Sequence, residues 1–311
     1  TSKKISQSMA KSQHQHPRKR KLRGLLRVLA TKKQIESSSY NPNDGLLRVS
    51  KSSFMTYVKC PRQYWWRHIG LPDVRIPATP EMLRGTMVHE TLEDLYEHYP
   101  KGGEQLLTNM MVEHDDVGVN ALAEMEMQRK EVWGMEHFMP IEFEVKHQVY
   151  DKELDVVMVG KMDGLFRHPE GGLCIAELKT GNLNSSKLSR TRKELCFYAR
   201  VLELMGYGEV THFMFMTPDC DNVDMLESLS NNKKKQVFTG LTQGLTLVEP
   251  VSKSSLKAFE KSLYHTIANL KLREWPIKWN DYFCMNWCDF HMACDNELNG
   301  LDDGPFANNE E

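Results

Sequence analysis

Residues 160–181 read GKMDGLFRHPEGGLCIAELKTG, and the rest of the chain is interpreted around them. Apolar residues are dense over Val156–Arg167 and again over Leu173–Thr180. Between these two segments lies His168–Gly172 (HPEGG), whose proline and glycines are typical of a turn. The pattern predicts two antiparallel strands joined by a five-residue loop.

The register of this predicted hairpin brings acidic side chains together. If Arg167 faces Leu173, then counting back along the ladder places Asp163 opposite Glu177. Lys179 shares their face, because side chains alternate along a strand with period two. Two carboxylates directly across a ladder repel each other, so their retention beside a lysine indicates a bound cation. The alternative is a hairpin with a solvated charged face.

Composition is that of an ordinary soluble protein, and it excludes a globally basic nucleic-acid-binding domain. The 311 residues are 40% hydrophobic and 26% charged, which suits one large domain or two small ones. The net charge of −2 conceals an asymmetry, since residues 1–35 contain eleven Lys or Arg and no Asp or Glu. The remainder holds 29 basic and 42 acidic residues, so a nucleic-acid site must be a local patch.

The two ends of the chain have the composition of disordered segments. Residues 1–46 form a basic arm, and HPRKRK within it is typical of a nuclear signal, a transit peptide or a nucleic-acid contact. Residues 296–311 form an acidic tail. No apolar run approaches the roughly 20 residues that span a bilayer, and there is no secretory signal. These features predict an intracellular protein without a membrane contact.

Between the two ends, helical and strand patterns alternate, which predicts a mixed α/β domain over residues 47–295. A helical insertion is expected at about residues 100–138. The other predicted elements are a helix from Ser50 broken at Pro61, helices over Pro80–Tyr99, Leu188–Met205 and Ser252–Leu272, and strands over Ile141–Asp151, Val210–Thr217 and within Lys235–Val248.

Three of the seven cysteines fall within eleven residues. Cys284, Cys288 and Cys294 lie in the segment 281–295, DYFCMNWCDFHMACD. Three thiolates need a fourth ligand to hold tetrahedral zinc or an iron–sulfur cluster, and His291 or the distant Cys60 could supply it. The other cysteines are interpreted as core residues, and they are Cys174, Cys196 and Cys220.

Six short motifs follow one another in a fixed order. They are Cys60-Pro61-Arg62, Gly85–His89 (GTMVH), Gly160–Asp163 (GKMD), Glu177-Leu178-Lys179, Glu194–Tyr198 (ELCFY) and the three-cysteine segment. This order resembles the RecB-like branch of the PD-(D/E)XK nuclease superfamily over residues 50–295. Within that branch, the chain is similar to the iron–sulfur members, which are the CRISPR-associated RecB-like exonucleases, the AddB nuclease domain and exonuclease V. The resemblance implies a restriction-endonuclease-like core, with a mixed sheet flanked by helices and an iron–sulfur-stapled helical region.

The resemblance also implies a role for each matched residue. His89, Asp163 and Glu177 would bind Mg²⁺ or Mn²⁺, and Lys179 would orient or deprotonate the attacking water. Tyr198 and Glu194 would support the site and contact DNA. A [4Fe-4S] cluster, with zinc as the lesser alternative, would be held by Cys60, Cys284, Cys288 and Cys294. Hard carboxylate ligands suit Mg²⁺ and Mn²⁺, and an imidazole shifts the preference towards Mn²⁺.

Two features depart from the family pattern. Glu194 stands where glutamine is usual, so a hydrogen bond donated by that amide is lost. The cysteine spacing is Cys-x3-Cys-x5-Cys, whereas the usual first gap is two residues. A local basic cluster that includes Lys187, Arg190 and Arg192 is the expected contact for a phosphate backbone.

Taken together, the motifs predict a metal-dependent deoxyribonuclease. The resemblance favours an exonuclease on single-stranded DNA with 5′-to-3′ polarity, acting in DNA repair, recombination, or CRISPR or viral DNA processing. A helicase or CRISPR adaptation proteins are the implied partners. The alternative hypothesis is a non-catalytic iron–sulfur DNA-binding or scaffold subunit.

Overall fold

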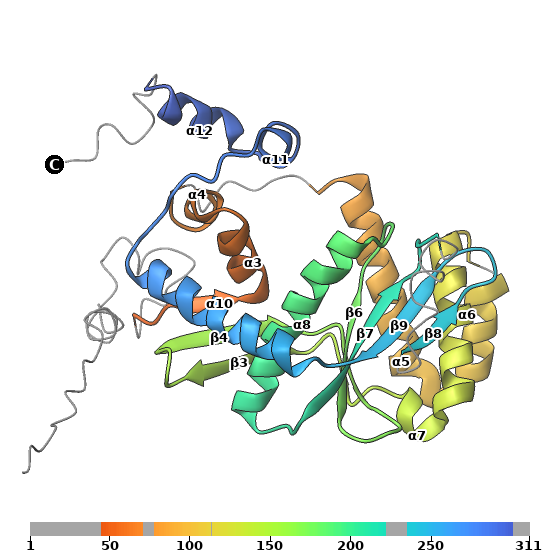
Figure 1. Ribbon diagram of the computed structural model, residues 1–311. Coiled ribbons are helices and arrows are strands. Elements are labelled where there is room, and N and C mark those ends of the chain that lie inside the picture. The colour runs from red at the N-terminus through yellow and green to blue at the C-terminus, as the bar shows by residue number, and fades with distance from the viewer. Residues whose placement is uncertain (1–44, 71–77, 113, 222–234, 301–311) are drawn as a thin grey trace, which may run out of the picture.

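Two β-sheets organise the computed structural model, which describes residues 45–70, 78–112, 114–221 and 235–300 (Figure 1). In the larger sheet, β6 and β7 are parallel and the other neighbours are antiparallel. Its strands, in spatial order, are β2 (Glu142–Phe143), β5 (Gly164–Arg167), β6 (Leu173–Leu178), β7 (Val210–Thr217), β9 (Leu245–Pro250) and β8 (Gln236–Thr239). The smaller sheet has the order β1 (Arg48–Ser50), β4 (Val156–Lys161) and β3 (Lys146–Asp151).

The hairpin register predicted from the sequence is confirmed. Arg167 pairs with Leu173, and the ladder runs back to Gly164 opposite Ala176. One step beyond the ladder, Asp163 comes level with Glu177. There the Asp163 side chain turns towards β6 and accepts a hydrogen bond from the backbone N–H of Leu178 at 2.7 Å.

The prediction of one continuous strand over Val156–Arg167 is wrong. It divides into β4 and β5, which belong to different sheets. The strand expected over Ile141–Asp151 divides in the same way, into β2 and β3, at Glu144, whose φ is 55°. The two breaks lie side by side, because the Glu144 N–H donates to the Asp163 carbonyl at 3.2 Å. One long hairpin therefore crosses from the smaller sheet to the larger, and Asp163 lies at the crossing.

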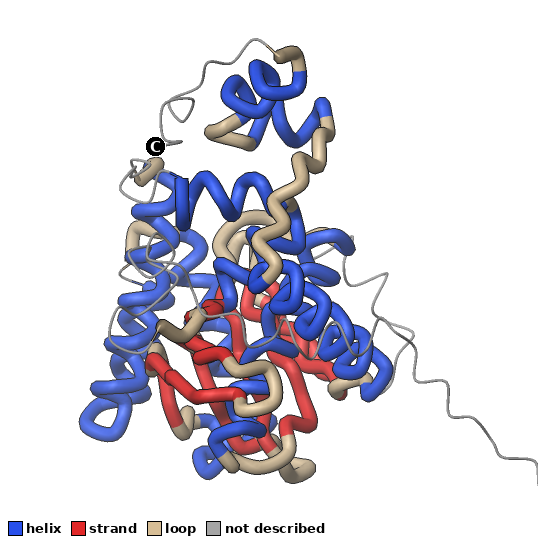
Figure 2. The backbone as a smooth tube through the Cα atoms, turned by 90° about the vertical axis from the view of Figure 1, so that its left-hand side faces the viewer, coloured by secondary structure: helices blue, strands red, loops and turns tan. Residues whose placement is uncertain are grey.

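Helices cover both faces of the larger sheet (Figures 1 and 2). On one face lie α3 (Lys51–Lys59), α8 (Ser185–Met205) and α10 (Lys253–Lys271). On the other lie α5 (Pro80–Val112), α6 (Val117–Trp133) and α7 (Met135–Phe138). Alternate residues of β7 enter the two cores, Phe213 and Phe215 the first, Met214 and Met216 the second. The predicted mixed α/β architecture, with a mixed sheet flanked by helices, is confirmed.

A small helical module stands apart from the sheets. It contains α4 (Pro61–Trp65), the π-helical turn η1 (Trp66–Gly70), α11 (Asp281–Trp287) and α12 (His291–Leu298), which gather above α3 in Figure 1. Helix α3 ends before Cys60 and Pro61 begins the next helix, as the proline predicts. Within the part of the chain that the structure describes, no helix is long and apolar enough to cross a membrane.

Some predicted boundaries differ from the structure. Helix α5 runs past residue 100 to Val112 with a kink at Gly102, so the expected helical insertion shares a helix with the preceding segment. Helix α12 continues to Leu298, and the first residues of the expected tail are therefore helical. Residues 1–44 of the basic arm and 301–311 of the tail lie outside the described residues.

Candidate metal centre

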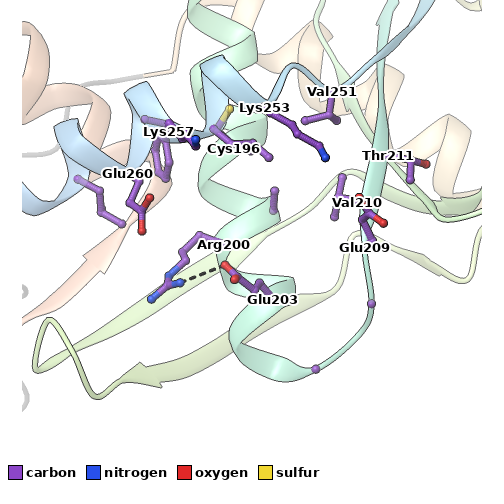
Figure 3. A pocket seen from close by; sticks show the side chains of 16 residues that line it. Cys196, Arg200, Glu203, Glu209, Val210, Thr211, Val251, Lys253, Lys257 and Glu260 are labelled. Atoms are coloured by element: carbon purple, nitrogen blue, oxygen red, sulfur yellow. Dashed lines mark hydrogen bonds and ion pairs between the residues drawn. The ribbon is translucent and has the colours of Figure 1, made fainter.

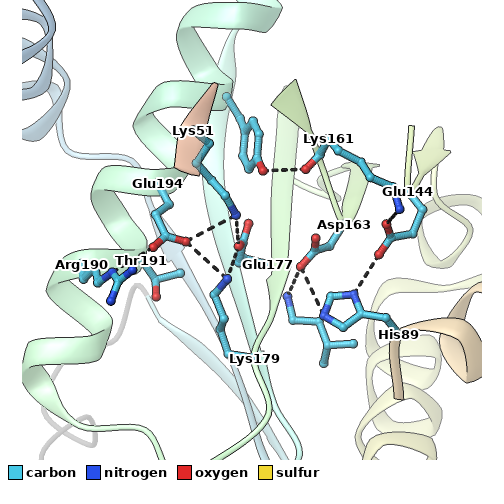
Figure 4. A network of polar contacts seen from close by, with 12 residues as sticks. Lys51, His89, Glu144, Lys161, Asp163, Glu177, Lys179, Arg190, Thr191 and Glu194 are labelled. Atoms are coloured by element: carbon cyan, nitrogen blue, oxygen red, sulfur yellow. Dashed lines mark hydrogen bonds and ion pairs between the residues drawn. The ribbon is translucent and has the colours of Figure 1, made fainter. Parts of the chain in front are cut away.

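Asp163 and Glu177 meet at one end of the β5–β6 hairpin, and both are buried. Figure 4 shows them facing the same space, with Lys179 below Glu177 and His89 beside Asp163. His89 comes from α5, and its Nε2 lies 4.0 Å from Asp163 Oδ2. The structure therefore brings together the four side chains that the sequence marks as catalytic or metal-binding.

Glu177 is held by two ammonium groups through one oxygen. Both Lys179 Nζ and Lys51 Nζ donate to Glu177 Oε1. Its other oxygen, Oε2, is buried and has no hydrogen-bond partner among the described residues. A buried carboxylate oxygen without a partner carries a free-energy cost that a bound cation would remove. Sequence interpretation missed Lys51, because its position at the start of a helix gives no sign of its contacts.

His89 is oriented by Glu144, a second residue that sequence interpretation missed. The His89 Nδ1 atom lies 2.8 Å from Glu144 Oε1, and Lys161 donates to the other oxygen of the same carboxylate. An Nδ1–H donated to a carboxylate leaves Nε2 free to bind a metal, which is the usual arrangement around metal-ligating histidines. In the alternating segment 141–151, Glu144 reads as an ordinary solvent-facing strand residue, and its positive φ has no sequence signal.

The donor set fits a divalent cation. Here the side chains whose ligand atoms all lie within 4.8 Å of one another are His89, Glu144 and Asp163, so Glu144 is a candidate ligand as well as the partner of His89, and Glu177 stands outside this group. Burial first, and then the charge of Glu177, raises the pKa of the Asp163 carboxyl to about 7. Burial would lower the pKa of the Lys179 ammonium, but Glu177 and Glu194 outweigh it and raise that pKa. Carboxylate oxygens with one imidazole suit Mn²⁺ or Mg²⁺.

The raised pKa of Asp163 predicts that metal binding depends on pH. A cation must displace the proton from this carboxyl below about pH 7, so Mn²⁺ affinity should rise with pH between about pH 6 and about pH 7, and the raised pKa of His89, whose imidazolium must also lose a proton, adds to the rise. Calorimetric titrations in buffers of different ionisation enthalpy would count the protons released. A constant affinity across that range, without proton release, would contradict the role of Asp163.

The Glu144 contact predicts a loss of metal affinity without loss of the fold. Glu144→Gln removes the charge that orients His89, and outer-shell changes of this kind cost roughly 10- to 100-fold in metal affinity. Glu142→Gln is the matched control, since that carboxylate contacts His147 at 2.6 Å and has no contact with His89. Equal Mn²⁺ affinities in the two variants would contradict the role of Glu144.

Two motif glycines lie where a neighbouring side chain approaches the backbone closely. A Cβ atom at Gly160 would lie 2.9 Å from the Tyr198 ring, and one at Gly85 would lie 3.2 Å from Thr180 Oγ1. Tyr198 therefore packs against β4 and donates from its hydroxyl to the Lys161 carbonyl at 2.5 Å. Helix α5 likewise lies against the segment that follows Lys179.

Helix α8 contributes supporting side chains as well as surface charge. Glu194 is buried and its carboxylate lies 3.3 Å from Lys179 Nζ and 3.2 Å from Arg190 Nε. Lys187 and Arg190 are exposed. Arg192 is turned away from them, and its Nη2 donates to Glu249 on β9 at 2.7 Å. The expected basic cluster is therefore divided, and only part of it faces solvent near the site.

The four motif cysteines gather in the helical module. Cys60, Cys284, Cys288 and Cys294 are all buried and carry free thiols. Cys60 and Cys284 act on Cys288 electrostatically, and burial raises the pKa of the Cys288 thiol. The Asn280 N–H donates to Cys284 Sγ at 3.4 Å and Gln63 Nε2 to Cys288 Sγ at 3.8 Å, contacts that suit thiolate ligands. His291 Nδ1 instead lies 2.9 Å from the Cys288 carbonyl oxygen.

The remaining cysteines are core residues, as predicted. They are Cys174, Cys196 and Cys220, and all three are buried among apolar side chains. Cys196 also borders a cavity of about 710 Å³ between α8, α10 and the start of β7 (Figure 3). That cavity is lined by none of the four motif side chains at the metal centre, so it is a separate feature of the surface.

Comparisons with known proteins address the fold and the family. A family model described as the PD-(D/E)XK nuclease superfamily matches residues 48–295. No curated protein sequence matches the chain. The crystal structure of SSO0001 is similar over 89% of this chain and 92% of that one, with 11% sequence identity. Its TM-score of 0.34 is too low to support an argument from structural likeness.

Proposed function

Because the chain belongs to the PD-(D/E)XK nuclease superfamily, we propose that it is a metal-dependent deoxyribonuclease, and specifically a 5′-to-3′ exonuclease on single-stranded DNA. The finer assignment rests on the order of the six motifs and their resemblance to the RecB-like iron–sulfur nucleases. Such an activity would act in DNA repair, in recombination, or in CRISPR or viral DNA processing. A helicase or CRISPR adaptation proteins would be its partners.

One observation carries the proposal. At the end of the β5–β6 hairpin, Asp163 and Glu177 are buried close to Lys179, and Glu177 Oε2 has no hydrogen-bond partner in the part of the chain that the structure describes. A solvated charged hairpin face would leave these groups in water, where their charges cost little. Lys51 and Lys179 pair with Glu177 through Oε1 only, so its Oε2 and the buried Asp163 carboxylate would still be stabilised by a bound cation.

His89, Asp163 and Glu177 would hold the cation, with Glu144 orienting His89. A bound Mg²⁺ or Mn²⁺ lowers the pKa of its water and offsets charge on the scissile phosphate. Lys179 is 40% exposed at its side chain and protonated, because its pKa is raised by Glu177 and Glu194. It therefore acts as a donor that orients the attacking water and contacts the phosphate, and its raised pKa argues against a role as the base.

The cysteine module is proposed to hold a [4Fe-4S] cluster through Cys60, Cys284, Cys288 and Cys294. All four cysteines are buried and carry free thiols, and two of the sulfur atoms accept hydrogen bonds from N–H groups, which supports this set of ligands. Ion pairs also join the two parts of the module, for example Arg67 Nη2 with Asp289 Oδ2 at 3.1 Å. The cluster would therefore fasten the C-terminal helices to α3 and α4.

DNA would approach over the exposed end of α8. Lys187 and Arg190 are exposed there and could contact a phosphate backbone. Tyr198 and Glu194 are buried, so they would support the site rather than touch DNA. Arg192, paired with Glu249, would stabilise the packing of α8 on the sheet.

Digestion of end-labelled single-stranded DNA tests the function. Wild-type protein and Lys179→Ala, prepared identically, would be compared in Mn²⁺, Mg²⁺ and EDTA. The proposal expects metal-dependent cleavage that is lost in the variant, with label release that reports 5′-to-3′ polarity. Folded wild-type protein that cleaves no DNA would support the non-catalytic scaffold instead.

A further inference from the structure

Lys51 occupies a position that local structure disfavours. It is the first residue of α3, directly after the N-cap Ser50, whose Oγ accepts from the Ser53 N–H at 3.1 Å. The positive end of the helix dipole opposes a cation in this turn, and only 19% of the side chain is exposed. Residues that violate local preferences in this way are found mainly at functional sites, where other groups compensate them.

The compensating groups all belong to the metal centre. Lys51 Nζ donates to Glu177 Oε1 and lies 3.4 Å from Glu194 Oε2. It also lies 5.1 Å from the centre of the Tyr198 ring, a cation–π distance. Glu194 and Tyr198 are one turn apart on α8, so one face of that helix presents both groups to Lys51. Figure 4 shows Glu194 and Lys51 pointing toward each other.

The two lysines that contact Glu177 fix the orientation of its carboxylate. Since Lys51 and Lys179 share Oε1, the carboxylate is fixed while Oε2 remains unpartnered among the described residues. An oxygen held free in this way is available to a cation without rearrangement. Glu194, which lies within 3.4 Å of both ammonium groups, balances the additional charge that Lys51 brings.

We propose that Lys51 is a positioning residue of the metal centre, and that Lys51 and Glu194 form an electroneutral pair that fixes Glu177 and sets the local charge. The inference rests on the proposed function, because it assigns a role within the same site. Together the pair adds no net charge, whereas removing either member alone changes the net charge of the site by one beside the cation and the phosphate.

The sign of that change gives opposite expectations for the two members. Lys51→Met removes one positive charge from the site, and the more negative site attracts a divalent cation and repels DNA phosphate. Glu194→Gln removes one negative charge, and the more positive site repels the cation and attracts the phosphate. The double variant restores the net charge of the wild-type site. A residue that only supported the fold would not produce shifts of opposite sign that cancel.

The test is a calorimetric titration of the full-length chain with Mn²⁺. Lys51→Met should bind Mn²⁺ about tenfold more tightly, and Glu194→Gln about tenfold more weakly. The double variant should return close to the wild-type dissociation constant. The turnover of Lys51→Met should nevertheless fall roughly 10- to 100-fold, because Glu177 is less well fixed.

A matched control separates this effect from the loss of any lysine. Lys130 on α6 also has a side chain that is 19% exposed, and it pairs with Glu104 away from the site. Lys130→Met should leave the Mn²⁺ dissociation constant unchanged. If Lys51→Met does not fold, Lys51→Arg keeps the charge and should retain wild-type affinity, and Glu194→Gln still carries its own prediction.

The possible outcomes separate a failure of the Lys51 proposal from a failure of the proposed nuclease function. Suppose that the wild-type protein cleaves DNA, but the Mn²⁺ affinities of the two single variants shift in the same direction, or the double variant does not recover the wild-type affinity. That result would overturn the role of Lys51 and leave the proposed function intact. Wild-type protein that neither binds Mn²⁺ nor cleaves DNA would overturn the proposed function together with it.

Discussion

Asp163→Asn is expected to abolish cleavage while leaving the metal-free protein folded and more stable than wild type. The substitution keeps the shape of the side chain and an oxygen that can accept the Leu178 N–H. It removes the charge that would bind the cation, and with it several kcal/mol of transition-state stabilisation, so cleavage should fall by about 10³-fold or more.

The stability increase follows from the buried charge. The pKa of Asp163 in the folded protein is raised to about 7 from an unfolded value of 3.8, so the folded state holds a proton that the unfolded chain releases. This contribution to stability is complete below pH 3.8 and is lost as the pH rises through about 7. Asparagine does not titrate, and its advantage over aspartate therefore grows with pH.

Single-turnover cleavage in saturating Mn²⁺, and urea unfolding in EDTA at about pH 8, measure the two effects. Asp94→Asn is the control, because Asp94 belongs to an exposed group with Glu97 and His98 on α5 that could also hold a metal ion. It should change neither measurement. Activity retained by Asp163→Asn, or a clear loss of stability in EDTA, would contradict the assignment.

Cys288→Ser is expected to remove bound iron and to destabilise the whole domain. A cluster that joins Cys60 to the three C-terminal cysteines closes a loop of more than 200 residues around the two sheets. Closing such a loop removes conformational entropy from the unfolded chain, by analogy with a disulfide worth roughly 4 kcal/mol. Insoluble or iron-free protein with a much lower unfolding midpoint is the expected result.

Iron content and thermal unfolding of purified protein check this expectation. Cys196→Ala is the control, since Cys196 is a buried thiol in the core between α8 and α10 and lies outside the motif. It should keep its iron even if it loses some stability. Soluble Cys288→Ser protein with full iron, full stability and full activity would contradict a structural cluster, and zinc in the wild type would identify the alternative metal.

The hairpin and its register could be predicted from the sequence because they depend on local information. The HPEGG turn and period-two alternation are sufficient to bring Asp163 level with Glu177. The division of the strands could not be predicted in this way. It depends on Glu144 and Asp163 meeting across two strands, a contact between residues 19 positions apart with no local signal.

The same reasoning explains which site residues the sequence did not reveal. His89, Asp163, Glu177 and Lys179 belong to motifs with recognisable spacing. Lys51 lies more than 100 residues from the carboxylates that it contacts, and its neighbours in the chain only indicate a helix start. Contacts of this kind are determined by how α3 packs against α8, which the sequence pattern does not specify.

The most direct test of the account is a crystal structure of the full chain soaked in Mn²⁺, with the ion located by its anomalous scattering. The account predicts a peak within about 2.5 Å of His89 Nε2, an Asp163 oxygen and Glu177 Oε2. Two other groups of side chains could also hold a metal. One consists of His168, Glu170 and His212, and the other of Asp94, Glu97 and His98. Peaks at those groups alone, with none at Asp163 and Glu177, would contradict a metal-dependent catalytic centre at the end of the hairpin.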